Sequence, residues 1–144
     1  WQRPDWDADK LMAQVEAAVA SGAYSYPRWS HAPLPPYQGF SGDHRVRSWQ
    51  RVAVARRMGL IPAPTQCSVC LKRTRRGHLH CEDYSRPLDA KPICVGCHFA
   101  LHKRFENPSQ WLAIVEKFGR PNSWFKTLGM VKAVNGRIKP RSVR

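Results

Sequence analysis

Two identical cysteine spacings are the strongest chemical signal in the sequence. Cys67 and Cys70 form one C-x-x-C pair, and Cys94 and Cys97 form a second pair after 23 intervening residues. Each pair can present both sulfurs to one side of a tight turn, and two such turns complete a tetrahedral site for zinc. Four thiolates leave no open coordination position, so we expect a structural Zn²⁺ rather than a catalytic one.

The alternatives to zinc are a disulfide framework and a redox C-x-x-C motif. A disulfide framework would leave Cys81 unpaired, and the sequence carries no secretory feature that would favour it. A redox motif would need one pair opening a helix after a strand, not two matched pairs. The spacing therefore favours zinc.

Histidines between and just after the cysteines indicate a second site. His98 and His102 are four residues apart, so they share one face if this segment is helical. His80 lies in an alternating segment, 78–81, that predicts a strand. Taken singly, each histidine is better interpreted as a phosphate donor or an ordinary surface residue. As a set beside an already complete zinc site, the three imidazoles favour a metal site that is open to substrate.

The run HLHCEDYSRPLDAKPICVGCHFALH, with the upstream CSVC, resembles the zinc-stapled HNH endonucleases over about 40 residues, 67–105. The resemblance implies an α+β chain with a small ββα-metal core, flanked by N- and C-terminal helices, that binds one divalent ion and cuts phosphodiester bonds. It places His98 and His102 at the metal-binding positions of the helix and Asp89 at the position of the family's central Asn. His80 matches the first residue of the family's His-His or Asp-His pair. The implied catalytic cofactor is Mg²⁺ or another divalent ion.

One residue departs from the family pattern. Cys81 stands where the family has the histidine that activates water, and a cysteine is a poor proton acceptor in that role. Three alternatives stay open: His80 is the base and Glu82 or Asp83 joins the metal; Glu82 is the base, because alternation places it on the strand face of His80; or the chain binds DNA without cutting it.

The net charge of +14 is unevenly distributed along the chain. Nine basic residues and no acid lie between residues 44 and 81, and no acid follows Glu116. Such a surface attracts polyanions, so we expect a nucleic acid as partner, with DNA first and RNA as the alternative. The basic stretches lack a broad apolar face, which argues against a membrane partner. The residues expected to contact phosphates are Arg45, Arg51, Arg56, Arg73, Arg75, Arg76, Lys103 and Arg104.

Hydrophobic periodicity and capping residues predict the flanking helices. One helix spans 7–20 and stops near Gly22, and a second begins at Asp43 as N-cap and ends near Gly59. A third has Asn107 as N-cap and Pro108 at its first position, and runs to Gly119. A short helix over 123–128 follows.

Composition divides the chain into three parts. Residues 1–42 combine the first helix with an arm rich in proline and aromatic residues, 43–130 form the zinc-stapled domain with its flanking helices, and 131–144 are a basic tail. The arm's aromatic side chains either stack on bases or hold the arm against the protein, and we favour the second.

Three functions fit these features. We expect a metal-dependent DNA nuclease domain, with a non-catalytic DNA-binding or regulatory protein and a zinc-ribbon RNA-binding protein as alternatives. No signal-peptide pattern and no run of about 18–20 apolar residues is present, so we expect a cytoplasmic, intracellular protein. The chain starts at Trp1 rather than Met, which leaves the true N-terminus open, and the oligomeric state is open as well.

Overall fold

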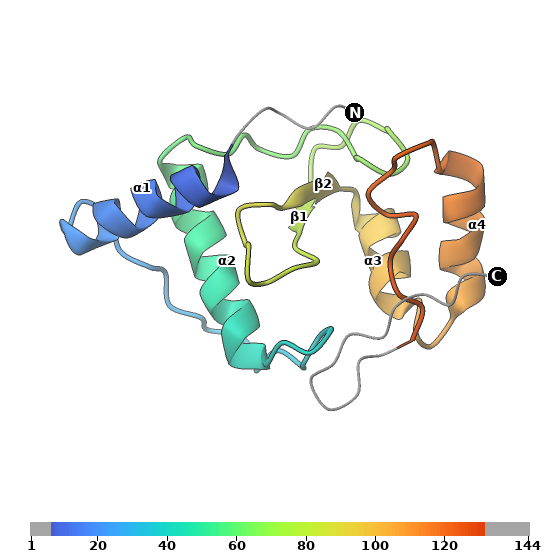
Figure 1. Cartoon of the computed structure of the whole chain (residues 1–144), viewed down its shortest axis with the longest axis horizontal. Helices are drawn as coiled ribbons and strands as arrows, with labels where there is room; N and C mark the ends of the chain where they lie inside the picture. Colours follow the sequence, from blue (N-terminus) through green and yellow to red (C-terminus); the bar gives the residue numbers. More distant parts are fainter. Residues whose placement is uncertain (1–6, 132–144) are drawn as a thin grey trace. The chain divides into compact units, whose positions relative to one another are not determined.

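The chain has a mixed α+β architecture of four helices and one two-stranded antiparallel sheet. The computed structural model describes residues 7–131 (Figure 1). The elements in chain order are α1 (Ala8–Ala20), α2 (Gly42–Arg57), β1 (His78–His80), β2 (Lys91–Ile93), α3 (Val95–Lys103) and α4 (Pro108–Phe118). The predicted basic tail spans 131–144, and its residues 132–144 lie outside the described residues.

These elements fall into two compact units, which are described separately below. The cysteine–histidine unit contains the described residues 64–80 and 91–131, and the helical unit contains 7–63 and 81–90. The sequence-based division at 42/43 and 130/131 stays a prediction. No helix within residues 7–131 is long and apolar enough to cross a bilayer.

A short hairpin and two helices form the cysteine–histidine unit. Strands β1 and β2 pair with His78 opposite Ile93 and His80 opposite Lys91. Three-residue strands are too short to be stable alone, so they depend on α3, which packs on β1, and on α4, which packs on α3. Trp111 of α4 is buried against Phe125, with ring centroids 6.1 Å apart. This apolar layer supports the helix that carries two of the histidines.

Helix α4 begins and ends as predicted, whereas the short helix predicted over 123–128 is wrong. Asn107 occupies the N-cap position, Pro108 is the first helical residue and Gly119 follows the last. Residues 121–127 form turns instead, in which Ser123 N donates to Arg120 O and Lys126 N donates to Ser123 O, three residues back in each case. The left-handed backbone of Asn122 (φ 63°) lies directly before 123–128 and separates this segment from α4.

Arg104 at the end of α3 is fully buried. Its Nε donates to Gly129 O (2.7 Å), its Nη1 donates to Leu101 O (2.8 Å), and its guanidinium lies 4.2 Å from the ring centroid of Phe105. The prediction that Arg104 contacts phosphate is therefore wrong, because this guanidinium joins segments of the protein interior.

We expect Arg104→Ala to lower the free energy of unfolding by about 2–3 kcal/mol, because Gly129 O loses its donor, Leu101 O keeps only the bond from the backbone N of residue 104, and side-chain packing is removed. Lys103→Ala is the matched control: Lys103 is exposed and pairs with Glu106 at 3.3 Å, so its loss should cost about 0.5 kcal/mol or less. Chemical denaturation of both variants measures the difference. Equal effects would show that Arg104 has no structural role.

Helices α1 and α2 pack together in the helical unit. Asp7 caps α1 through its carboxylate, which accepts from Asp9 N and Lys10 N, as the predicted start implies. The predicted cap of α2 is wrong: Ser41 is the N-cap, with its Oγ accepting from His44 N (3.1 Å), and Asp43 lies in the first turn.

The first turn of α2 includes a close backbone approach at Gly42. Gly42 is the first helical residue, and a Cβ at this position would lie 2.0 Å from Leu34 O. Only glycine fits there, and local periodicity does not report such a distant contact. Gly22 and Gly59 follow the ends of α1 and α2 with left-handed φ values of +80° and +75°. This is the conformation that commonly ends a helix, as predicted for both glycines.

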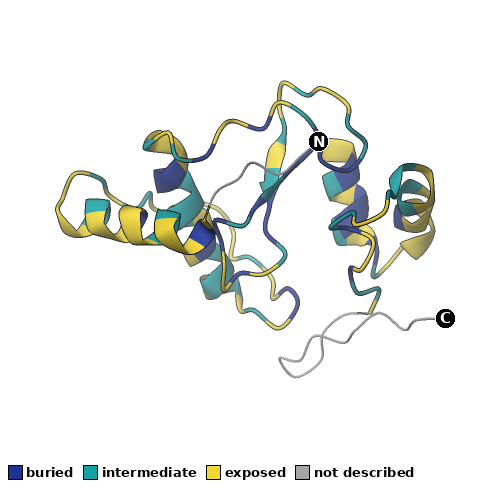
Figure 2. Cartoon of the chain, turned by 45° about the horizontal axis from the view of Figure 1, so that its top comes forward, coloured by how far each residue is buried: buried dark blue, intermediate teal, exposed yellow. Residues whose placement is uncertain are grey.

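The aromatic arm packs within the helical unit. Tyr37 is buried, Trp29 meets Trp49 edge to face with centroids 5.1 Å apart, and Phe40 meets Tyr84 at 5.6 Å. Most positions of the arm are exposed or intermediate (Figure 2), and the buried ones are Tyr37 and Gln38. These contacts support the prediction that the aromatic residues hold the arm in place.

Two of the predicted phosphate-contacting arginines take part in the same packing. Arg45 lies between the rings of Tyr37 and Tyr84, at 5.4 and 5.5 Å, and its Nε donates to Tyr84 Oη (3.1 Å). Arg51 lies 5.0 Å from the ring centroid of Tyr26. Burial raises the pKa of the Tyr84 phenol, so its hydroxyl stays protonated at neutral pH.

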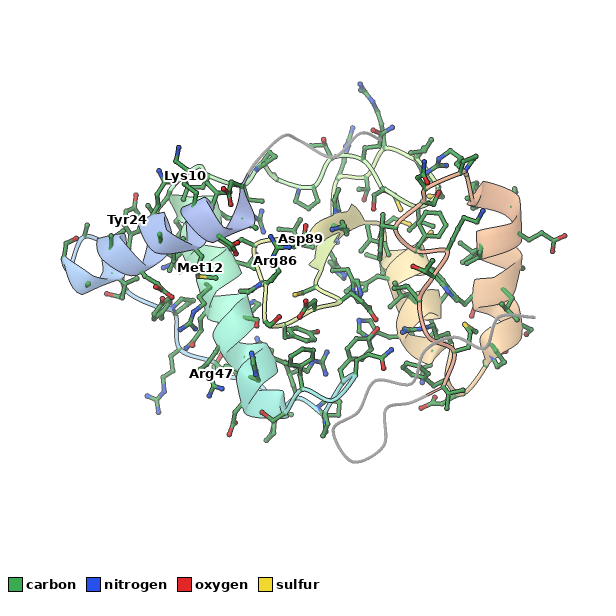
Figure 3. All side chains as sticks on the ribbon, viewed as in Figure 1. Lys10, Met12, Tyr24, Arg47, Arg86 and Asp89 are labelled. Atoms are coloured by element: carbon green, nitrogen blue, oxygen red, sulfur yellow. The ribbon has the colours of Figure 1, made fainter. Side chains whose placement is uncertain are left out.

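An open cavity of about 320 Å³ lies within the helical unit. Met12 of α1 and Arg47 of α2, both labelled in Figure 3, line it together with Tyr84. Arg86, also labelled, lies 3.7 Å from the carboxylate of Asp9. Among the described residues, this unit contributes no cluster of side chains able to hold a metal ion.

Candidate metal centres

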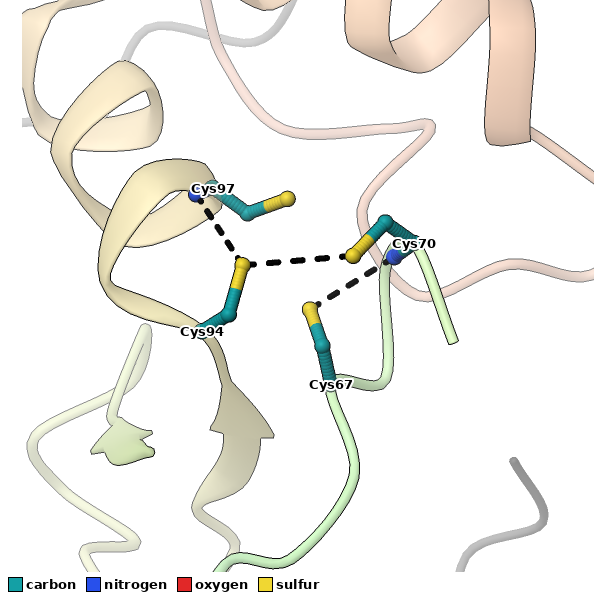
Figure 4. Close-up of side chains that lie close together, drawn as sticks. All are labelled: Cys67, Cys70, Cys94 and Cys97. Atoms are coloured by element: carbon teal, nitrogen blue, oxygen red, sulfur yellow. Dashed lines mark hydrogen bonds between the residues drawn. The ribbon is translucent and has the colours of Figure 1, made fainter. Parts of the chain in front are cut away.

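The four paired cysteines converge in the cysteine–histidine unit (Figure 4). Their Sγ atoms all lie within 4.8 Å of one another, and the sulfurs of Cys70 and Cys94 are 3.9 Å apart. Zn–S bonds of about 2.3 Å at tetrahedral angles place sulfurs about 3.8 Å apart. The cluster therefore has the geometry of a closed four-thiolate site and can hold zinc.

Backbone amides point at the sulfurs of both pairs. Cys67 Sγ accepts from Val69 N (3.4 Å) and Cys70 N (3.5 Å). Cys94 is the N-cap of α3, and its Sγ accepts from Cys97 N (3.4 Å). Such donors, and the positive end of a helix, stabilise a thiolate and thus the metal-binding form.

Ser68 brings the two cysteine pairs together. Its backbone N donates to Pro92 O (2.8 Å), and its Oγ donates to the same carbonyl, two residues before Cys94. The first turn is closed by a bond from Cys67 N to Lys72 O (2.9 Å). The backbone therefore holds the two turns side by side.

The ionisation of the thiols shows why a cation belongs in this cluster. A hydrogen bond from the Cys97 thiol lowers the pKa of Cys67, and the same bond and burial raise the pKa of Cys97. Burial also raises the pKa of Cys70. Ionisation of Cys67 is thus favoured while Cys70 and Cys97 resist it, so four thiolates require a multivalent cation among them.

A second cluster forms from the three predicted histidines. The Nε2 atoms of His98 and His102 lie 2.9 Å apart, and His98 Nε2 lies 3.3 Å from His80 Nδ1. Zn–N bonds of about 2.0–2.1 Å at tetrahedral angles place nitrogens about 3.3–3.4 Å apart. Three ligand nitrogens from β1 and α3 therefore surround a point where one ion fits.

The surroundings give this cluster one fixed side and one accessible side. His80 is 1% exposed and stacks on Trp124, with centroids 5.8 Å apart and planes inclined by 24°. Trp124 Nε1 donates to Ser68 Oγ (3.0 Å), which links the histidine cluster to the first cysteine turn. His98 and His102 are half-buried, so a substrate can approach from α3.

The other residues named from the family resemblance belong to the helical unit. Glu82 Oε2 accepts a hydrogen bond from Tyr37 Oη (2.8 Å), and the buried Cys81 thiol donates to Asp83 O (3.2 Å). Cys81 is not a member of the four-cysteine cluster. The catalytic roles of Glu82 and Asp89 stay predictions.

Sequence reasoning missed two residues beside the histidine cluster. His78 Nδ1 lies 2.9 Å from His98 Nδ1, and the alternation of a strand, which places His78 and His80 on one face, is the signal that indicates it. Trp124 stacks on His80 across a long sequence separation, and no local pattern reports that contact.

A comparison of the chain with protein-family models, curated proteins and solved structures gave no match.

Proposed function

We propose that this chain is a metal-dependent DNA endonuclease with an HNH-like ββα-metal core stapled by a four-cysteine zinc. The observation that carries the proposal is the convergence of His80, His98 and His102, from a hairpin strand and the following helix, on one point. A structural domain would need only the four cysteines, so the second, accessible cluster calls for a separate role. Metal-assisted hydrolysis supplies one.

The donor set decides which ions fit this second site. Three imidazoles suit Zn²⁺, Ni²⁺, Co²⁺ or Cu²⁺, whereas Mg²⁺ prefers carboxylate, carbonyl and water oxygens. Of the predicted candidates, Mg²⁺ or another divalent ion, we therefore propose a divalent transition-metal ion at the histidine cluster. Such an ion supplies Lewis-acid stabilisation of the charge that develops on a scissile phosphate.

The geometry of the imidazoles bears on the three alternatives for the base. His80 Nδ1 faces His98 Nε2, so His80 is better used as a ligand than as a proton acceptor. Glu82 as the base stays a prediction of the sequence; within the helical unit its carboxylate accepts a hydrogen bond from the Tyr37 hydroxyl. The Cys81 thiol is occupied with Asp83 O and is not proposed as a base.

An exposed basic loop in the cysteine–histidine unit supports DNA as the substrate. Lys72, Arg73, Arg75 and Arg76 are exposed or half-exposed, and within residues 7–131 their side chains form no hydrogen bond or ion pair. The loop itself is held in place, since Thr74 N donates to Thr65 O (3.0 Å). Cations on a fixed loop are suited to phosphate contacts, which position a duplex without reading its sequence.

We expect the triple variant Arg73→Ala, Arg75→Ala, Arg76→Ala to bind duplex DNA more weakly at low salt. The slope of log K against log [salt] should become shallower by about 2.7 if all three contact phosphates. A charge-matched triple variant of exposed residues of the helical unit, Lys10→Ala, Arg28→Ala, Arg57→Ala, is the control. Identical slopes for the two triple variants would exclude the loop as a phosphate-binding surface.

The proposed activity is tested by plasmid nicking with the full chain. Protein holding only its cysteine-bound zinc is incubated with Mg²⁺, Mn²⁺, Co²⁺, Ni²⁺ or Zn²⁺, and we expect nicking with the ions that bind imidazole. Tight DNA binding without nicking in any metal would contradict the nuclease proposal and favour a non-catalytic DNA-binding protein. A strong preference for RNA would favour the zinc-ribbon RNA-binding alternative.

A further inference from the structure

A fourth histidine contacts the three-histidine cluster from outside it. His78 is exposed, its Nδ1 lies 2.9 Å from His98 Nδ1, and the two ring centroids are 5.2 Å apart with planes inclined by 75°. His78 and His80 share one face of β1, and both reach His98. Both ring nitrogens of His98 therefore have a nitrogen neighbour: Nε2 faces the cluster and Nδ1 faces His78.

The pairing with His78 bears on the tautomer of His98. A neutral imidazole carries one N–H and one lone pair, and a metal ligand must direct its lone pair at the ion. If the proton lies on Nδ1, it is donated to His78 Nδ1, and the Nε2 lone pair points to His80 and His102. The opposite tautomer would place an N–H where the ion belongs.

We propose that His78 is a positioning residue that accepts the Nδ1 hydrogen of His98 and so holds His98 in its metal-binding tautomer and orientation. The inference rests on the proposed metal site and adds a residue that touches no metal. Hydrogen-bond partners of this kind fix the ring of a ligating histidine and increase its basicity. Their removal lowers metal affinity by about 10–100-fold.

The test measures Co²⁺ affinity by visible absorption in the full chain with zinc retained at the cysteines. His78→Phe keeps a ring but removes the acceptor, so we expect the affinity for Co²⁺ to fall about 10–100-fold. His78→Asn carries a side-chain oxygen close to the position of the lost Nδ1, and should restore affinity to within about threefold of the native chain. His31→Phe, at an exposed position of the helical unit, is the control for losing a histidine and should bind as the native chain does.

The outcomes separate this inference from the proposed function. Unchanged Co²⁺ affinity in His78→Phe, or equal losses in the Phe and Asn variants, would overturn the role of His78 and leave the nuclease proposal standing. A native chain that binds no Co²⁺ beyond the cysteine site would overturn both. If Co²⁺ bound normally but no nicking occurred, the proposed nuclease activity alone would be overturned and the role of His78 would stand.

Discussion

Cys94→Ser should release the zinc and unfold the cysteine–histidine unit of the full chain. Cys94 is a member of the sulfur cluster and the N-cap of α3, and serine keeps a side-chain oxygen for the cap, so the substitution removes the metal ligand alone. Structural zinc contributes about 10–16 kcal/mol in small peptides, which matches or exceeds the whole stability of most domains. Strands of three residues cannot replace that contribution.

Metal analysis and amide hydrogen exchange measure this effect. The native chain should keep one zinc after treatment with a chelator that removes weakly bound ions, and Cys94→Ser should keep none and lose protection over 64–80 and 91–131. Cys81→Ser is the matched control, because Cys81 is buried outside the cluster, and it should retain the zinc. If Cys94→Ser kept both the zinc and its protection from amide exchange, the proposed structural role of a four-cysteine zinc would be wrong.

His98→Ala should abolish metal-dependent nicking while leaving the zinc staple intact. His98 lies between the other two ligands of the cluster. Its Nε2 is 2.9 Å from His102 Nε2 and 3.3 Å from His80 Nδ1. Two remaining imidazoles hold an ion much more weakly, and Lewis-acid stabilisation worth several kcal/mol is lost with it. We expect a decrease in rate of about 10³-fold or more.

The matched control for nicking is His31→Ala, an exposed histidine of the helical unit that should leave the rate unchanged. Zinc content and thermal unfolding of His98→Ala should equal those of the native chain, because His98 is half-buried and is not a member of the sulfur cluster. Nicking that survives His98→Ala at the native rate would locate the activity elsewhere. His102→Ala should also stay folded.

The parts of the site predicted from sequence are those that depend on short spacings. Two C-x-x-C turns and an i, i+4 histidine pair are local patterns, and the structure brings both sets together. The bounds of α1 and α4 were also predicted within a residue, because Asp7 and Pro108 mark them locally. The residues themselves predicted one strand, over 78–81, and the pairing with a second strand was expected only from the family resemblance.

The parts that sequence reasoning missed depend on contacts between distant residues. Arg104 looks like a surface cation in sequence, yet carbonyls 3 and 25 residues away bury its guanidinium. Local patterns likewise report neither the approach of Leu34 O to Gly42 nor the contact of Trp124 with His80 across 44 residues. Periodicity and capping patterns report neighbours along one element, so they carry no information on such contacts.

X-ray anomalous scattering from crystals of the full chain soaked with Mn²⁺ or Co²⁺ tests the central claim most directly. The histidine cluster should show one ion bound to His80 Nδ1, His98 Nε2 and His102 Nε2 at about 2.0–2.2 Å, separate from the zinc among the four sulfurs. A filled cysteine site with no ion between the imidazoles, or imidazoles directed away from one another, would contradict the account and leave a zinc-stapled basic protein without metal-dependent chemistry.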